Sequence, residues 1–77
     1  MKAAIILATG FEEIEAIAPL DILRRCVVYA SLVGLDAREV IGAHFVSIKT
    51  DSTLKSYDFS TCDMIILPGG LPGAEHL

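Results

Sequence analysis

Residues 3–34, AAIILATGFEEIEAIAPLDILRRCVVYASLVG, decide the fold, because two apolar runs flank a segment with helical periodicity. The runs at 3–8 and 27–34 are apolar without alternation, which is typical of strands covered on both faces in a parallel sheet. The segment between them predicts a helix over roughly residues 10–26. Strand, helix and strand in this order form a βαβ unit with a right-handed crossover. The predicted fold class is therefore α/β with a mostly parallel sheet.

The start of the predicted helix carries a local signal. Thr9 is followed three residues later by Glu12, which matches a capping box in which each side chain satisfies a free backbone amide. Pro19 is expected to kink the helix without ending it, since the helical pattern resumes in LDILRR.

The remaining residues predict smaller elements. Two β-prone pieces near 38–41 and 44–49 predict a hairpin, and the polar segment 51–63 predicts a short helical turn and a surface loop. The run DMIILP, residues 63–68, predicts another fully buried strand. It leads into a Gly-Gly pair and then into what looks like the start of a further helix.

Composition limits the class of protein. A chain of 77 residues with 53% hydrophobic content is at most one domain, near the lower limit for an independent core. The net charge is −4 and the bases do not cluster, apart from Arg24-Arg25, which argues against a nucleic-acid partner. The apolar start is too short for a signal peptide and acids follow it, so we expect no membrane segment.

The two cysteines, Cys26 and Cys62, follow neither a CxxC nor a metal-ligand spacing. Free thiols without such a pattern favour a reducing, cytoplasmic setting. The sequence therefore predicts no metal site and no cofactor.

Glu15 is the most informative side chain of the predicted helix. Placing residues about 100° apart around the helix axis puts Glu15 inside an apolar arc. A carboxylate on an apolar face must be paired, hydrogen-bonded or protonated. The alternative is that Glu15 borders the arc and reaches water. The arc consists of Ala16, Ala18, Pro19, Leu20, Ile22, Leu23 and Cys26.

The turn Pro68-Gly69-Gly70 is expected at the same edge of the sheet as the start of the helix. Ligands of open α/β sheets bind outside the carboxyl ends of the strands, where both segments would lie. Two adjacent glycines allow backbone amides to face a ligand without obstruction. Glu15 would then face the glycine pair, although the glycines alone are also explained by a tight turn.

Two quoted stretches, ILATGFEEIEAIAPLDILRR at 6–25 and DMIILPGGLPGAEHL at 63–77, resemble the amino-terminal half of the ThiJ/PfpI family, which includes the Parkinson-associated protein deglycases. The resemblance covers nearly the whole chain and is weaker from 34 to 60. It implies a flavodoxin-like three-layer sandwich, here incomplete, in which residues 1–77 are the amino-terminal half of one domain. It also implies a homodimer.

The resemblance further implies a catalytic arrangement. Family activity depends on a cysteine at a strand-to-helix elbow, a glutamate in the first helix and glycine amides of the PGG turn that help to form an oxyanion hole. Carried over by motif, these positions are Glu15, Gly69 and Gly70. The nucleophile of the family lies beyond the PGG turn, outside this chain, and neither Cys26 nor Cys62 takes its place.

Three functional classes remain open at this point. The first is a glyoxalase-like or deglycase-like hydrolase that acts on small carbonyl compounds or glycated proteins, with this chain as its front half and the missing carboxyl-terminal half as a partner. The second is a stress chaperone or oxidation sensor, which also occurs in the family. The third is a truncated, inactive fragment.

Other positions carry weaker expectations. Relatives hold a small anion with basic side chains, and Arg25 matches one such position while His44 matches another loosely; for both, a solvated or ion-paired surface role is the alternative. Many relatives have glycine where the helix ends, whereas this chain has Cys26-Val27. Because valine tolerates left-handed backbone geometry poorly, we expect a differently shaped helix end. We assign no role to His76.

Overall fold

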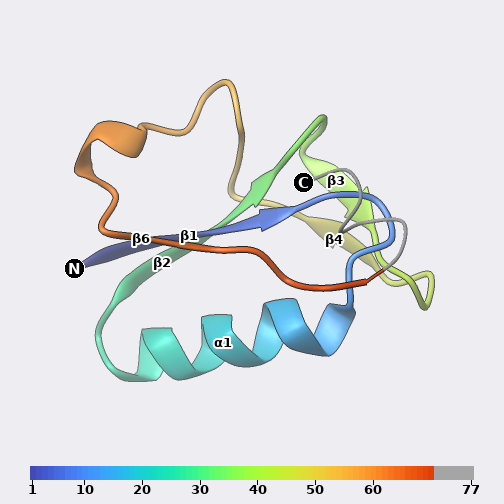
Figure 1. The fold of residues 1–77 in the computed structure, drawn as a ribbon, viewed down its shortest axis with the longest axis horizontal. Coiled ribbons are helices and arrows are strands. Elements are labelled where there is room, and N and C mark those ends of the chain that lie inside the picture. Colours follow the sequence, from blue (N-terminus) through green and yellow to red (C-terminus); the bar gives the residue numbers. More distant parts are fainter. Residues whose placement is uncertain (71–77) are drawn as a thin grey trace.

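A computed structural model describes residues 1–70 of the chain, and Figure 1 shows the arrangement of its elements. Four strands form one parallel sheet in the order β5-β2-β1-β6, and β3 and β4 form a separate hairpin. This confirms the predicted α/β class. The elements are β1 (Lys2–Leu7), α1 (Glu13–Arg25), β2 (Tyr29–Gly34), β3 (Glu39–Ile41), β4 (Ser47–Lys49), β5 (Ser52–Thr53), the 3-10 helix η1 (Phe59–Thr61) and β6 (Met64–Ile66).

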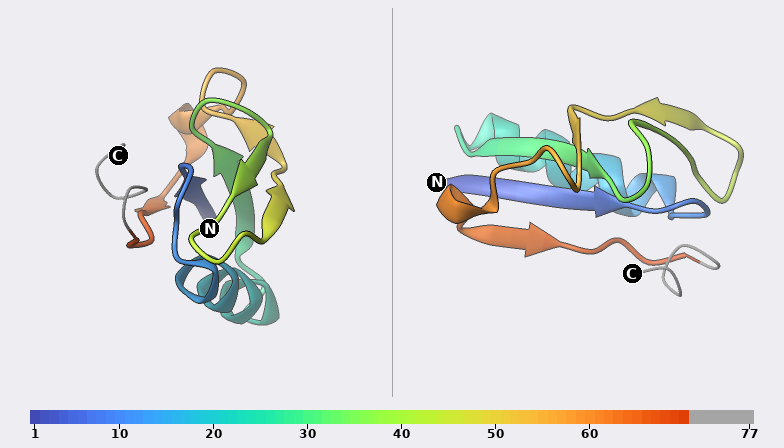
Figure 2. Two further views of the ribbon diagram at one scale, coloured as in Figure 1. Left: turned by 90° about the vertical axis from the view of Figure 1, so that its right-hand side faces the viewer. Right: turned by 90° about the horizontal axis from the view of Figure 1, so that it is seen from above.

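The βαβ unit formed by β1, α1 and β2 is confirmed, and α1 lies along one face of the sheet (Figure 1, Figure 2). Alternate residues of β1 point to opposite faces. Ile5 and Leu7 pack with Phe11 and Ala16 on the helix side. Ala4 and Ile6 pack on the other side, where the segment around η1 covers them. Both faces of β1 are therefore buried, which explains its uninterrupted apolar sequence.

The predicted capping box at the start of α1 is wrong. The helix begins at Glu13, and Glu12 is its N-cap residue without a side-chain cap. The Glu12 N–H, which a Thr9 cap would have bonded, donates to the Gly69 carbonyl oxygen at 2.8 Å. A backbone acceptor far away in the sequence therefore replaces the local cap. The helix continues through Pro19 to Arg25, as expected.

The predicted apolar arc of α1 is only partly correct. Ala16 is buried and Pro19, Leu20 and Leu23 are partly buried, so a narrow stripe at helical spacing contacts the sheet. The other members of the predicted arc, Ala18, Ile22 and Cys26, are exposed. A single helix lying on a sheet buries one stripe, and the wider apolar arc extends beyond the area of contact.

The carboxyl end of α1 also differs from expectation. Val27 has a φ of 61° and therefore adopts the left-handed geometry that its branched side chain disfavours. The Val28 N–H donates to Leu23 O at 3.0 Å and the Val27 N–H to Arg24 O at 3.1 Å, which is the Schellman pattern of hydrogen bonds. The helix end thus keeps the geometry that glycine favours, with valine in its place.

The predicted hairpin is confirmed, since β3 and β4 pair in antiparallel register with Val40 opposite Ile48. The predicted helical turn is η1. The parallel strand β5, which pairs with the end of β2, was not predicted because its two residues are polar.

The prediction of a fully buried last strand is wrong. Ile65 is 55% exposed and Leu67 is 57% exposed. β6 is an edge strand of the described sheet, and the segment around η1 covers the neighbouring β1 on that face rather than β6. The helix predicted after Gly70, like His76, lies outside the described residues. Within residues 1–70, no helix is long and apolar enough to cross a membrane.

Candidate functional site

The turn after β6 contacts the first turn of α1 through two hydrogen bonds. The Gly69 carbonyl oxygen accepts from the Glu12 N–H at 2.8 Å, and the Gly69 N–H donates to Glu15 Oε1 at 2.7 Å. Both partners lie at the carboxyl edge of the parallel sheet, since β1 and β6 run in the same direction. The structure therefore places Glu15 against the glycine turn, as the sequence predicted.

The environment of Glu15 differs from the prediction. The residue is exposed, so its carboxylate is held by a backbone donor and not by exclusion from water. This agrees with the alternative that Glu15 borders the apolar stripe of α1. Oε2 accepts no hydrogen bond from residues 1–70. One oxygen is thus fixed, and the other has no hydrogen-bond partner among the described residues.

Gly70 occupies a position that only glycine fits. Its φ is 114°, and an added Cβ would lie 2.5 Å from Gly10 O and 2.7 Å from Glu12 N. A Cβ on Gly69 would lie 2.8 Å from Glu15 Oε1. The glycine pair therefore permits close contact with the start of α1, beyond what a tight turn alone requires. The Gly70 N–H has no acceptor among the residues described.

Neither cysteine lies near this contact. Cys26 is exposed at the C-cap of α1, the end of the helix opposite Glu15. The Cys62 Sγ lies 3.2 Å from Met64 O and 3.9 Å from Lys2 O, at the amino ends of β6 and β1. Both thiols are thus at the wrong end of the fold to act with Glu15, in agreement with the sequence analysis.

Arg25 is also remote from Glu15. It lies in the last turn of α1, and its Nε is 3.1 Å from Asp21 Oδ2 with both side chains largely exposed. Such exposed pairs contribute little to stability. The structure shows the ion-paired surface role, and no contact supports the anion site, which stays a prediction.

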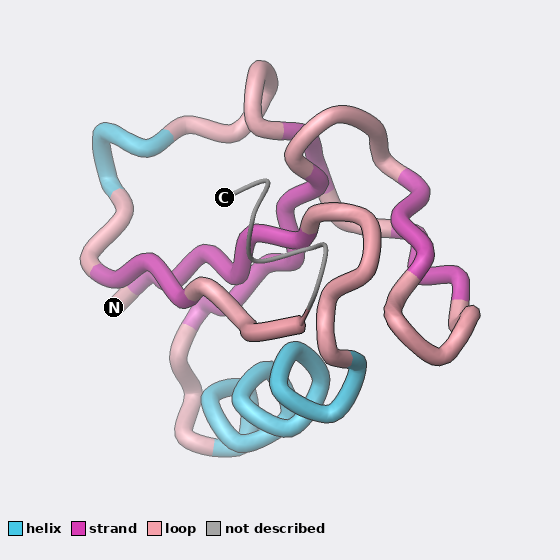
Figure 3. Tube along the Cα trace, turned by 45° about the vertical axis from the view of Figure 1, so that its right-hand side comes forward, coloured by secondary structure: helices cyan, strands magenta, loops and turns pink. Residues whose placement is uncertain are grey.

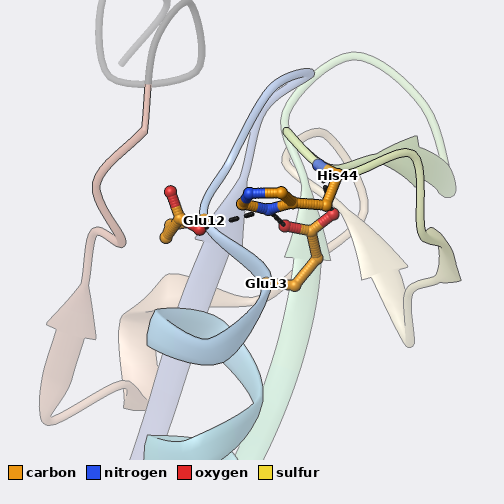
Figure 4. Close-up of side chains that lie close together, drawn as sticks. All are labelled: Glu12, Glu13 and His44. Carbon is orange, nitrogen blue, oxygen red and sulfur yellow. Dashed lines mark hydrogen bonds and ion pairs between the residues drawn. The ribbon is translucent and has the colours of Figure 1, made fainter.

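Sequence reasoning missed a second carboxylate on the same helix turn. Glu13 Oε2 accepts from the backbone N–H of His44 at 2.8 Å and of Val46 at 3.3 Å. The His44 Nδ1 lies 3.0 Å from Glu13 Oε1 and 3.3 Å from Glu12 Oε1 (Figure 4). No signal in the sequence links these residues; the close approach is visible only in the structure, where an added Cβ on Gly42 would collide with the Glu13 carboxylate.

The contacts of Glu13 change its proton affinity. Burial of the carboxyl group acts to raise its pKa, but hydrogen bonds from the His44 side chain and from backbone amides outweigh this and lower the pKa to about 2. The hydrogen bond to Glu13, followed by the charges of Glu12 and Glu13, raises the pKa of His44 above its usual 6.5. Glu13 is thus ionised at neutral pH, with His44 biased toward its charged form.

The chain is similar to proteins of one known family. The model of the DJ-1/PfpI family matches residues 1–77. The chain is 37% identical over 78 residues to the Parkinson disease protein 7 homolog of Danio rerio, covering 99% of this chain and 41% of that protein. It is 37% identical over 77 residues to protein dj-1beta of Drosophila melanogaster, with the same coverage of both.

Solved structures give the same result. The crystal structure of Drosophila melanogaster DJ-1beta matches with a TM-score of 0.92 at 36% identity, covering 97% of this chain and 41% of that one. Oxidized Toxoplasma gondii DJ-1 matches with a TM-score of 0.90 at 35% identity, covering 96% and 41%. The chain spans about two fifths of the length of these relatives, and its α/β sheet is part of their flavodoxin-like fold. With its whole length matched by the family model, the chain belongs to the DJ-1/PfpI family.

Proposed function

We propose that this chain supplies the acid/base carboxylate and a backbone oxyanion donor of a cysteine-dependent hydrolase that acts on reactive carbonyl compounds. The observation that carries the proposal is the hydrogen bond of 2.7 Å between Gly69 N and Glu15 Oε1. It fixes one oxygen of an otherwise exposed carboxylate at the edge where α/β sheets bind their ligands.

In the proposed reaction a thiolate attacks the carbonyl carbon, and the carbonyl oxygen becomes an oxyanion. Glu15 takes the thiol proton through Oε2, the oxygen without a described partner, as the thiolate forms, and then gives this proton to the oxyanion. The Gly69 N–H already donates to Glu15, so we assign the oxyanion to the Gly70 N–H and revise the predicted pair of donors. The thiol would come from the part of the family domain that these 77 residues do not cover.

The test is the rate of methylglyoxal turnover by Glu15→Leu and Glu15→Gln in protein that contains the nucleophile. We expect kcat to fall by roughly 10²–10⁴-fold, the usual loss for an acid/base group. Glu39→Gln is the matched control, because Glu39 is an exposed acid whose side chain accepts a hydrogen bond only from Ser47 among the residues described. Full activity in Glu15→Leu rejects the proposal.

We also propose that the protein acts as a homodimer through the outer side of α1 and the hairpin turn. Ile14 is 77% exposed and Phe45 is 88% exposed, and Ile14 and Val46 line one surface cavity. Exposed apolar side chains that adjoin one another are typical of contact surfaces. Sedimentation of an Ile14→Glu, Phe45→Glu variant would show a monomer where the unaltered protein shows a dimer, and an unchanged dimer would exclude this surface.

The proposed location is the cytoplasm. Cys26 and Cys62 are both free thiols in the structure, which supports a reducing compartment.

A further inference from the structure

Glu12, Glu13 and His44 bring three possible metal ligands together outside the Glu15–Gly69 contact. Each contributes one ligand atom, and the three atoms lie within 4.8 Å of one another (Figure 4). The two carboxylates come from the start of α1, and the imidazole comes from the turn of the hairpin. The fold, and not the sequence spacing, assembles this group.

The distances suit a bound ion. The His44 Nδ1 lies 3.0 Å from Glu13 Oε1 and 3.3 Å from Glu12 Oε1. Zinc binds nitrogen and oxygen ligands at about 2.0–2.2 Å, so two ligands at a tetrahedral angle are roughly 3.3–3.6 Å apart. Only small side-chain shifts would therefore replace the present hydrogen bonds by bonds to one central ion.

Glu13 is oriented for this role. Its Oε2 accepts the backbone N–H groups of His44 and Val46, which leaves Oε1 directed at the imidazole. In protein metal sites, hydrogen bonds to the atom of a ligand that does not bind the metal regularly fix the orientation of that ligand. The Glu13 side chain is only 12% exposed, so this arrangement is sheltered from water.

The charges favour a cation despite the position of the site at a helix start. The positive end of the helix dipole corresponds to about half an elementary charge. The two carboxylates of Glu12 and Glu13 outweigh it, and the ion would bind in place of the proton that His44 otherwise holds. The imidazole nitrogen discriminates against Mg²⁺ and Ca²⁺, which prefer oxygen ligands, and favours transition metals such as zinc.

The site would leave room for another ligand. In a single subunit a cavity of about 320 Å³ adjoins the three side chains and is also lined by Ile14 and Val46, and His44 is 72% exposed. In the homodimer proposed above, the partner subunit would border this cavity. Three protein ligands with an open position are typical of zinc sites that bind water or a substrate, whereas structural sites have four. We propose that Glu12, Glu13 and His44 form an open binding site for a divalent transition-metal ion, with zinc as the best match.

The proposal is tested by titrating the full-length protein with Zn²⁺ in competition with a chromophoric indicator. We expect His44→Gln and Glu12→Gln each to weaken binding at least tenfold, the scale that even indirect partners of metals show. Glu12→Gln is informative because the Glu12 side chain contacts His44 without bonding the hairpin backbone, so the variant should keep the fold. Glu39→Gln is the control and should bind zinc like the unaltered protein.

The thiols of Cys26 and Cys62 can also bind zinc, so their contribution must be distinguished from that of the proposed site. The titration is therefore repeated in a Cys26→Ser, Cys62→Ser background, where we expect the same affinity and a Co²⁺ spectrum without thiolate charge-transfer bands. Loss of zinc binding in the serine background would overturn the proposal. Equal affinity in Glu12→Gln, His44→Gln and the unaltered protein would also overturn it.

Discussion

Glu13 and Glu15 lie two positions apart on the first turn of α1 and hold different parts of the chain. Glu13 accepts backbone amides of the hairpin turn, and Glu15 accepts the Gly69 amide of the turn after β6. Residues two positions apart on a helix point to nearly opposite sides. Figure 3 shows the hairpin and the segment after β6 on either side of the loop that leads into α1.

Glu13 and Glu15 are the same residue type but differ in the number of their hydrogen-bond partners. Glu13 has three partners in two backbone amides and an imidazole, and its side chain is 12% exposed. It is suited to hold structure as a fixed anion. Glu15 has one backbone partner among the described residues and is exposed. The proposed function requires such a carboxylate, with one oxygen that no described residue holds.

The largest effect on stability is expected from Gly70→Ala, which disturbs the turn that contacts Glu15. The φ of 114° and the proximity of Gly10 O to an added Cβ both oppose alanine. Residues forced into such backbone regions cost about 1–3 kcal/mol each. We expect chemical denaturation to give a free energy of unfolding that is lower by about 1–3 kcal/mol.

Gly69→Ala is the matched variant. Its Cβ would meet the flexible end of Glu15 instead of backbone, so it should cost less stability while displacing the carboxylate. Equal stability of Gly70→Ala and the unaltered protein would show that the turn does not lie against α1 as described.

A substitution at the carboxyl end of α1 tests the stability of the helix without changing the contacts of Glu13 or Glu15. Val27→Gly should raise the free energy of unfolding by about 1 kcal/mol, since a branched residue in left-handed geometry costs about 1–2 kcal/mol and glycine gives part of this back in entropy. Val27→Ala retains a Cβ and should gain less. A destabilised Val27→Gly variant would contradict the observed geometry of the helix end.

The contact between Glu13 and His44 predicts a range of pH in which the hairpin is held most firmly. The measurement uses chelator-treated protein, so that no metal ion occupies this contact. The pKa of Glu13 is lowered to about 2, so its contribution is present above the ordinary carboxyl pKa of 4.5 and is lost as pH falls toward 2. The pKa of His44 is raised, so its contribution is present below 6.5 and is lost as pH rises through the raised value.

Amide hydrogen exchange at Val46, corrected for the intrinsic effect of pH, should therefore be slowest between about pH 4.5 and 6.5. In His44→Gln the change on the alkaline side should disappear, and the change on the acid side should become smaller, because the hydrogen bond from His44 also helps to lower the pKa of Glu13. Protection that is independent of pH would show that the pair does not hold the hairpin.

The parts of the fold that the sequence predicts are those with local causes. The apolar run of β1 is buried on both faces, and the hairpin around Gly42 follows from its short β-prone pieces. The failures have distant causes. The Glu12 amide bonds to Gly69, which no local capping rule anticipates, and the burial of β6 depends on which segments cover it.

The candidate site also has one part that the sequence predicts and one part that depends on distant residues. Glu15 and the glycine pair were predicted because a carboxylate near an apolar stripe and a glycine turn both stand out in the sequence, and the family resemblance selects them as well. The approach of His44 to Glu13 depends on the path of the hairpin, which brings together residues 31 positions apart. The positions and charges of these two residues in the sequence gave no reason to predict a contact between them.

The most direct test of the central claim, that Glu13 and Glu15 hold separate segments, is a pair of NMR spectra of backbone amides. Glu15→Ala should shift the Gly69 amide and leave those of His44 and Val46 in place, because Gly69 is the one residue within 1–70 that donates to the Glu15 side chain. Glu13→Ala should do the reverse. If either variant shifts both sets of amides equally, or neither, the account of two independent contacts is contradicted.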